Sequence, residues 1–236
     1  MLISSYSERL RLSQMTLSKL LCFLRDEIWT SAHVASLVFE CSLSAAYKKL
    51  NQLESKSLII SYKIPELNLK IWGITALGNF EAWDNEVMQK RPSFQPSKIN
   101  FMFVQHHIDL QVAMLNAKSK GGINWMNGKY LPKNILQRPD AILTWTNDVR
   151  WAVEYERTVK TRKRYEVIFS NYLQVIKAGD YSFIHYICPD DLFVTRLKKL
   201  FSSIESVPVA GQRIALNEKH RSKFIVSSLQ NWPPSQ

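Results

Sequence analysis

Three acidic residues are spaced so that they could gather at one metal-binding site. Asp140 follows Pro139 at the start of an apolar run, and Glu154 and Glu156 lie two positions apart in the next run. Residues two apart on a strand point to the same face of a sheet. A short hairpin between the runs would bring Asp140 beside the two glutamates, so we expect three crowded carboxylates.

Crowded carboxylates repel each other unless a cation neutralises them. Oxygen ligands without cysteine suit Mg²⁺ or Mn²⁺, so we expect Asp140, Glu154 and Glu156 to hold one of these ions. Such an ion neutralises charge that develops on a phosphate during its cleavage. The sequence therefore predicts metal-dependent phosphodiester chemistry. The alternative is that both glutamates are outward strand residues paired with basic neighbours.

Five cations follow the acids within eight positions: Arg157, Lys160, Arg162, Lys163 and Arg164. We expect them at the start of a helix, where the helix dipole disfavours positive charge. A solvated helix face is the ordinary meaning of such a run, but contact with phosphate explains both its place and its charge. Lys160 and Lys163 are the candidate catalytic lysines, and the three arginines are candidate DNA contacts.

A pair of histidines and three tyrosines are further candidates. His106 and His107 precede Asp109 on an expected helix, and His107 is our candidate accessory to the acids, with a packed or capping role as its alternative. Adjacent histidines cannot form the His-hydrophobe-His metal triad of tyrosine relaxases. Three tyrosines could be covalent nucleophiles, but core packing or stacking on DNA is the more ordinary role: Tyr155, Tyr165 and Tyr172.

The composition indicates an anionic partner. The 236 residues include 31 Lys and Arg against 20 Asp and Glu, a net charge of +11, and nucleic acid is the commonest partner of such a chain. No apolar run approaches the roughly 18–20 residues that cross a bilayer, so we expect no membrane insertion. Scattered Cys22, Cys41 and Cys188 argue against a disulfide framework or a structural zinc site and fit a reducing compartment, so we expect a cytoplasmic protein. We expect no small-molecule cofactor.

The first part of the chain has the element order of a winged helix-turn-helix, with strands and helices predicted from apolar periodicity. The expected elements are a helix over Leu12–Ile28, a helix from Thr30 or Ser31 through Phe39, a helix capped by Ser42 or Ser44 with the inner stripe Leu43, Ala46, Leu50 and Leu53, strands Leu58–Ile64 and Leu69–Ile74, and a helix near Thr75. Four residues of the third helix should face outward and reach a major groove: Ser44, Tyr47, Lys48 and Asn51. The alternative is a scaffold for protein contacts.

Two prolines and two serines mark a linker at 91–98, between a domain at 1–90 and one at 99–230, with a frayed tail at 231–236. The expected elements of the second domain are a helix over Phe101–Lys118, strands Ile123–Met126, Pro139–Thr146 and Val149–Glu156, a helix over Thr158–Ala178, a strand over Ser182–Cys188 and a helix over Asp190–Ser203. The fold class is thus α+β, and the order α-β-β-β-α-β is that of restriction-endonuclease-like nucleases.

Pro139-Asp140-x₁₃-Glu154-x-Glu156 resembles the PD-(D/E)xK nuclease motif. The sequence departs from it at Glu156, where the motif has lysine. Related enzymes can recruit that lysine from the next helix, which makes Lys160 and Lys163 the candidates.

Across about residues 10–190 the chain resembles the replication-relaxation family, and within it the MobC-type relaxases of mobilizable plasmids. The resemblance rests on the winged-helix pattern, on His106-His-Ile-Asp109, on Arg138-Pro-Asp-Ala-Ile-Leu143, on Val153-Glu-Tyr-Glu-Arg-Thr158 and on the basic helix with Tyr172. It implies a protein that nicks one strand at a plasmid origin of transfer, with a coupling ATPase and other relaxosome proteins as partners.

Two other functions remain open at this point. A non-catalytic DNA-binding regulator with a degenerate nuclease fold would account for the missing motif lysine. A restriction-type nuclease would cut both strands at many sites.

Overall fold

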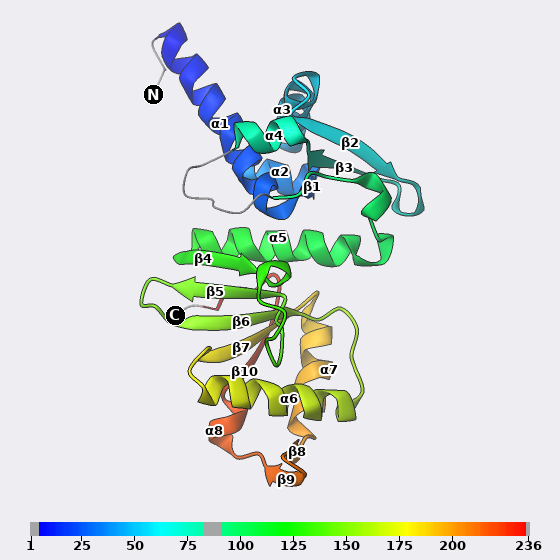
Figure 1. Cartoon of the computed structure of the whole chain (residues 1–236), viewed down its shortest axis with the longest axis vertical. Helices are drawn as coiled ribbons and strands as arrows, with labels where there is room; N and C mark the ends of the chain where they lie inside the picture. Colours follow the sequence, from blue (N-terminus) through cyan, green and yellow to red (C-terminus); the bar gives the residue numbers. More distant parts are fainter. Residues whose placement is uncertain (1–4, 83–90, 235–236) are drawn as a thin grey trace. The chain divides into compact units, whose positions relative to one another are not determined.

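The computed structural model describes residues 5–82 and 91–234 (Figure 1). It divides into two compact units, Met1–Gln111 and Val112–Gln236, and the division falls within one helix, α5 (Val104–Ser119). Both units combine helices with sheets, which confirms the α+β class. The predicted domain end at residue 90 lies outside the described residues. No helix in the described ranges is both long and apolar enough to cross a membrane.

The first unit packs helices on a three-stranded antiparallel sheet of order β1-β3-β2. Its elements are α1 (Tyr6–Glu27), β1 (Trp29–Ser31), α2 (Ala32–Phe39), α3 (Leu43–Ser55), β2 (Ile59–Ile64), the 3₁₀ turn η1 (Pro65–Leu67), β3 (Leu69–Ile74), α4 (Ala76–Glu81), and the 3₁₀ turns η2 (Pro96–Lys98) and η3 (Phe101–Phe103). Ser31, Ser42 and Thr75 each accept a backbone N–H as N-cap of the helix that follows. The core gathers Leu20, Leu24 and other apolar residues around Trp72.

Two details of the first unit differ from expectation. α1 begins at Tyr6, before the first apolar residue of its stripe, because Ser5 caps it. Leu43 was expected on the inner stripe of α3 but is 48% exposed, whereas Ala46, Leu50 and Leu53 are buried. Leu43 is the first residue of α3, so its side chain projects from the helix end and does not reach the core.

The second unit is built on a five-stranded mixed sheet of order β10-β7-β6-β5-β4. Its elements are β4 (Gly122–Asn127), η4 (Gly128–Tyr130), β5 (Ala141–Trp145), β6 (Arg150–Tyr155), α6 (Arg162–Lys177), β7 (Phe183–Cys188), α7 (Asp191–Ser202), β8 (Ser206–Val209), β9 (Gln212–Ala215), α8 (Glu218–Arg221) and β10 (Phe224–Ser228). β4, β5 and β6 are antiparallel, whereas β7 runs parallel to β6 and β10 parallel to β7. The apolar core lies between this sheet and helices α6 and α7 (Figure 1).

α6 begins four residues later than the periodicity predicts. The expected start was Thr158, but Thr161 is the N-cap, and its hydroxyl oxygen accepts the backbone N–H of Arg164 at 3.3 Å. Arg157 and Lys160 therefore precede the helix, and only Arg162, Lys163 and Arg164 form its first turn. The buried face of α6 carries Tyr165, Phe169 and Tyr172, which pack on the sheet.

Thr161→Ala is expected to destabilise the protein by about 1 kcal/mol, the usual cost of removing an N-cap oxygen. Thr161→Ser keeps the oxygen and should lower the free energy of unfolding by only a few tenths of the loss expected for Thr161→Ala. Urea unfolding followed by circular dichroism measures both. Equal stability of the alanine and serine variants would contradict this role of the hydroxyl.

The prediction of a frayed tail is wrong for Trp232, which is 1% exposed. Its indole N–H donates to the carbonyl of Ala113 at 2.8 Å, and Lys120 donates to the carbonyl of Pro233 at 3.0 Å. Burial of a large apolar ring lowers the free energy by more than the loss of conformational entropy at the chain end raises it. Residues 235–236 lie outside the described part.

Candidate metal and phosphate site

Asp140 lies directly before β5, where two backbone segments hold it beside the end of β6. Its Oδ2 accepts the backbone N–H of Tyr155 at 2.8 Å, and its carbonyl accepts the N–H of Gly128 at 2.6 Å. A Cβ at Gly128 would lie 2.1 Å from the carbonyl oxygen of Pro139, so this approach requires glycine. The predicted hairpin thus places Asp140 next to the acids of β6.

Glu154 faces α6 from the last part of β6. Its Oε1 accepts a hydrogen bond from the Tyr172 hydroxyl, which is fully buried. Burial, and then the negative charge of Asp140, raise the pKa of Glu154 to about 8. Burial and the nearby Glu154 also raise the pKa of Tyr172, so this residue stays a neutral hydrogen-bond donor. Asp140 and Glu154 therefore form a close pair of carboxylates in which one is protonated near neutral pH.

Glu156 comes directly after β6 and is held by residues of its own chain. It is 4% exposed, and its Oε2 accepts hydrogen bonds from the Lys160 ammonium and from the Tyr165 hydroxyl, the latter at 2.8 Å. Its backbone N–H donates to the carbonyl of Ile187 at 2.9 Å, which extends the pairing with β7. Lys160 thus neutralises Glu156 directly.

The donor set fits a divalent ion at two carboxylates. In the described ranges no three His, Cys, Asp or Glu side chains gather as a possible metal site, so the three predicted ligands do not form one ligand group. Asp140 and Glu154 remain as a pair whose repulsion a cation would relieve. Mg²⁺ is typically bound by one or two carboxylates together with substrate phosphate oxygens, which is the chemistry of this pair.

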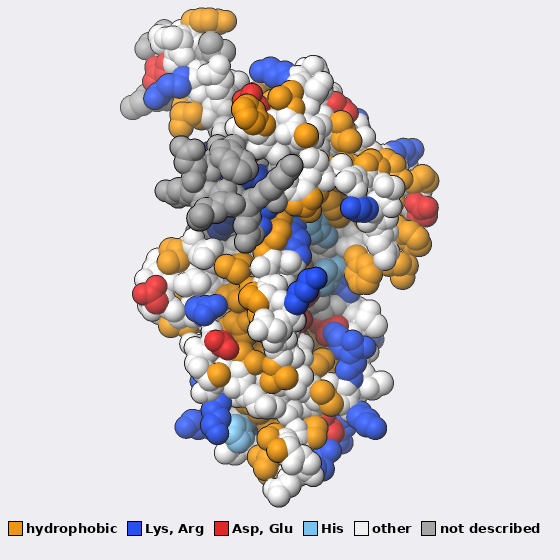
Figure 2. All heavy atoms as spheres, in the orientation of Figure 1, with side chains coloured by type: hydrophobic (Ala, Val, Ile, Leu, Met, Phe, Trp, Pro, Cys, Tyr) orange, Lys and Arg blue, Asp and Glu red, His pale blue; other side chains and the backbone are white. Residues whose placement is uncertain are grey.

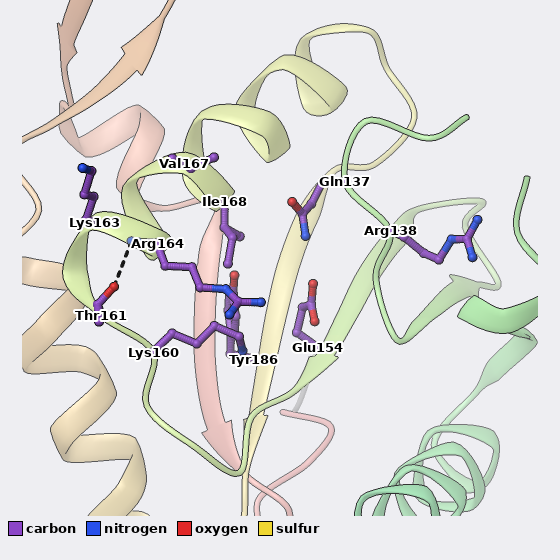
Figure 3. A pocket seen from close by; sticks show the side chains of 10 residues that line it. All are labelled: Gln137, Arg138, Glu154, Lys160, Thr161, Lys163, Arg164, Val167, Ile168 and Tyr186. Carbon is purple, nitrogen blue, oxygen red and sulfur yellow. Dashed lines mark hydrogen bonds between the residues drawn. The ribbon is translucent and has the colours of Figure 1, made fainter. Parts of the chain in front are cut away.

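A cavity of about 500 Å³ opens beside Glu154, between β6, β7 and the start of α6. Figure 3 shows six side chains directed into it: Gln137, Glu154, Lys160, Arg164, Ile168 and Tyr186. Lys163 and Arg138 also line the cavity but point away from its centre (Figure 3). Of the two candidate lysines, Lys160 is therefore the one beside the acids.

The cavity lies on a basic side of the second unit. Figure 1 shows the segment that leads into α6. At the same place in Figure 2, lysine and arginine side chains gather around a few acidic atoms. Arg162 is exposed and forms an ion pair at 3.2 Å with the buried Glu166, which also pairs with Arg213 of β9 at 2.8 Å. Arg157 is exposed in the segment before α6.

His107 lies in the first unit and is packed there. Its ring centroid is 4.3 Å from that of Trp29, its Nε2 is 2.9 Å from Gln111 Nε2, and it lies 3.7 Å from a carboxylate oxygen of Glu27. These contacts correspond to the packed role that the sequence analysis names as the alternative to an accessory role.

The four predicted groove-contacting residues of α3 are all exposed: Ser44, Tyr47, Lys48 and Asn51. Tyr47 also packs edge-on against Trp72, with ring centroids 5.4 Å apart, so its ring is partly fixed.

Sequence reasoning missed Gln137 and Tyr186 as residues of the cavity. Tyr186 is the register partner of Glu154 in the parallel pair β6–β7, a relation that no local pattern reveals. Tyr165 and Tyr172 were candidates for nucleophiles, but both are buried and donate to the acids.

Neither a protein-family model nor a curated protein sequence matches this chain.

Proposed function

We propose that the chain is a plasmid mobilization relaxase, which binds an origin of transfer and nicks one DNA strand by divalent-metal-dependent phosphodiester cleavage. One observation carries the proposal: the half-buried pair Asp140 and Glu154 borders a cavity into which Lys160 and Arg164 extend. Paired carboxylates with adjacent cations suit a reaction in which negative charge develops on a phosphate.

Each group has a role in this reaction. Asp140 and Glu154 would hold Mg²⁺ or Mn²⁺, which supplies positive charge next to the scissile phosphate. Tyr172 and the Tyr155 backbone N–H fix the two carboxylates. Lys160 and Arg164 bind phosphate oxygens.

Water is the nucleophile that fits best, since the hydroxyls of Tyr165 and Tyr172 are buried and their pKa values are raised. The water oxygen forms a bond to phosphorus as the strand's P–O bond breaks. The attacking water gives up one proton to solvent, and the departing oxygen takes up one proton from solvent.

The first unit supports a role in DNA binding. Its helices α1, α2 and α3 followed by the β2–β3 hairpin have the order of a winged helix, and the second unit has the α-β-β-β-α-β order of PD-(D/E)xK nucleases. The exposed Lys48 and Asn51 on α3 would contact the origin in its major groove. In this proposal the protein acts in the cytoplasm, together with a coupling ATPase and other relaxosome proteins.

The test is incubation of the full chain with a supercoiled plasmid that carries the cognate origin. We expect open-circular product with Mg²⁺ or Mn²⁺, none with EDTA, and none from a plasmid without the origin. Linear product from cuts at many sites would favour a restriction-type nuclease instead. Tight binding to the origin without any cleavage would overturn the proposed activity.

A non-catalytic DNA-binding regulator is the second candidate, because Glu156 replaces the motif lysine and Lys160 is engaged by it. Calorimetric titration with Mn²⁺ separates the two candidates. Origin binding without any binding of Mn²⁺ would favour the regulator.

A further inference from the structure

We infer that the cavity beside Glu154 binds a single unpaired nucleotide of a DNA strand. Its phosphate would lie on Lys160, Arg164 and the Tyr186 hydroxyl, and its base against Ile168 and Gln137. The inference rests on the proposed nicking function. It adds to that function that one nucleotide is unpaired from the opposite strand next to the metal site. It is carried by the chemistry of the two ends of the cavity.

One end of the cavity has unsatisfied capacity to donate hydrogen bonds. Tyr186 is 1% exposed, and its hydroxyl has no hydrogen-bond partner among residues 5–82 and 91–234. A buried hydroxyl without a partner is costly, and a ligand oxygen in the cavity would remove that cost. Burial and the neighbouring Glu154 raise the pKa of Tyr186, so it remains a neutral donor.

Two cations converge on the same end. The Arg164 side chain extends into the cavity toward Tyr186 (Figure 3), and its guanidinium has no ion-pair partner within the described ranges. Lys160 lies beside them, and an ammonium with three donors can bind Glu156 and a phosphate oxygen together. The first turn of α6 adds the positive end of its helix dipole. Two charged donors and one neutral donor suit a phosphate group.

The other end suits a nucleobase. Ile168 presents an aliphatic surface on which a planar ring can lie. Gln137 Oε1 accepts a hydrogen bond from Asn171 at 3.4 Å, which directs the Gln137 NH₂ group to the cavity as a donor for a base carbonyl or ring nitrogen. The volume of about 500 Å³ falls within the roughly 300–1,000 Å³ of small-ligand pockets. A stacked and paired base cannot enter such a recess, so the nucleotide must be unpaired.

The first experiment is calorimetry of the full chain, without metal, with three probes: thymidine 5′-monophosphate, thymidine and inorganic phosphate. We expect the monophosphate to bind at least about tenfold more tightly than either fragment, because only it fills both ends. Equal affinities for the monophosphate and inorganic phosphate would reduce the cavity to a phosphate site and overturn the inference.

Two variants assign the phosphate end. Tyr186→Phe should weaken binding of the monophosphate about tenfold and leave the melting temperature unchanged or higher, because it removes a hydroxyl without a partner. Arg164→Gln should weaken binding by about 10- to 100-fold. The matched control is Arg196→Gln, the same change on the exposed face of α7, which should alter nothing. Unaltered affinity in both Tyr186→Phe and Arg164→Gln would overturn the assignment.

The second experiment distinguishes a strand from a free nucleotide. We compare a DNA duplex containing one bulged thymidine with the fully paired duplex of the same length, and expect tighter binding of the bulged duplex that Arg164→Gln reduces. Binding of the monophosphate without preference for the bulge would assign the cavity to free nucleotides and overturn the inference. Nicking of the origin plasmid without either kind of binding would overturn it while the proposed activity stands. Bulge preference without nicking would instead overturn the activity.

Discussion

Glu154→Gln is expected to reduce nicking by on the order of a thousandfold, since a metal ion's charge stabilisation of the transition state is worth several kcal/mol. Glutamine keeps the shape of the side chain and can still accept the Tyr172 hydrogen bond, so the loss would come from the charge. The measurement is the rate of open-circular product from an origin plasmid with Mn²⁺. A variant that retains a tenth or more of the activity would contradict a metal-binding role of Glu154.

The same variant should also differ from the natural protein in how its stability depends on pH, which a merely local disturbance would not change. The pKa of Glu154 is about 8 in the folded protein and near 4.5 in an ordinary glutamate. Between these pH values the folded state holds a proton that the unfolded state has lost, so stability falls as pH rises, by at most about 1.4 kcal/mol per pH unit. Glutamine carries no such cost. The melting temperature of Glu154→Gln should therefore exceed that of the natural protein by an amount that grows as the pH rises from 5 to 8.

Differential scanning fluorimetry in EDTA at pH 5, 6.5 and 8 measures this difference. Glu205→Gln is the matched control, because the same change at an exposed glutamate should give a flat difference across the three pH values. A flat difference for Glu154→Gln as well would show that Glu154 is ionised in the folded protein throughout this range.

Local periodicity was sufficient to predict most elements of both units. The strands around Asn147-Asp148 pair as an antiparallel hairpin, with Asp148 at φ 59°, and this places Asp140 beside Glu154 as the spacing predicts. The turn between Trp145 and Val149 has three residues, and a short hairpin turn that ends on a residue tolerating positive φ is a strong local signal. The α+β class and the position of the acid pair follow from such signals.

Partners that are distant in sequence could not be predicted in this way. β10 is a five-residue strand whose pairing with β7 is parallel, and Trp232 is buried against Ala113 more than one hundred positions earlier. Nothing near these segments in sequence marks the surfaces that receive them. Lys160 was expected beside the acids but within a helix, whereas it lies in the irregular segment before α6, from which its ammonium donates to Glu156.

Lys160→Met is expected to destabilise the protein by about 2–4 kcal/mol. The Glu156 side chain is 5% exposed, and Lys160 is its only cationic partner in the described part of the chain. Removing one member of a buried ion pair leaves an uncompensated charge, which costs about 3–5 kcal/mol when both groups are fully buried. The figure is lower here because the Lys160 side chain is 29% exposed. Urea unfolding at pH 7 measures the loss, and Lys163→Met, whose side chain is exposed, should stay within about 0.5 kcal/mol of the natural protein.

The double variant Lys160→Met with Glu156→Gln separates the structural role of Lys160 from a role at the phosphate. A neutral glutamine can still accept the Tyr165 hydrogen bond, so the double variant should recover most of the stability that Lys160→Met loses. If Lys160 also binds the scissile phosphate, the stable double variant should remain at least about tenfold slower in nicking, because a charge-assisted hydrogen bond is still missing. Full recovery of nicking together with stability would make Lys160 a partner of Glu156 alone. A double variant as unstable as Lys160→Met would mean that the ammonium stabilises the fold through contacts other than Glu156.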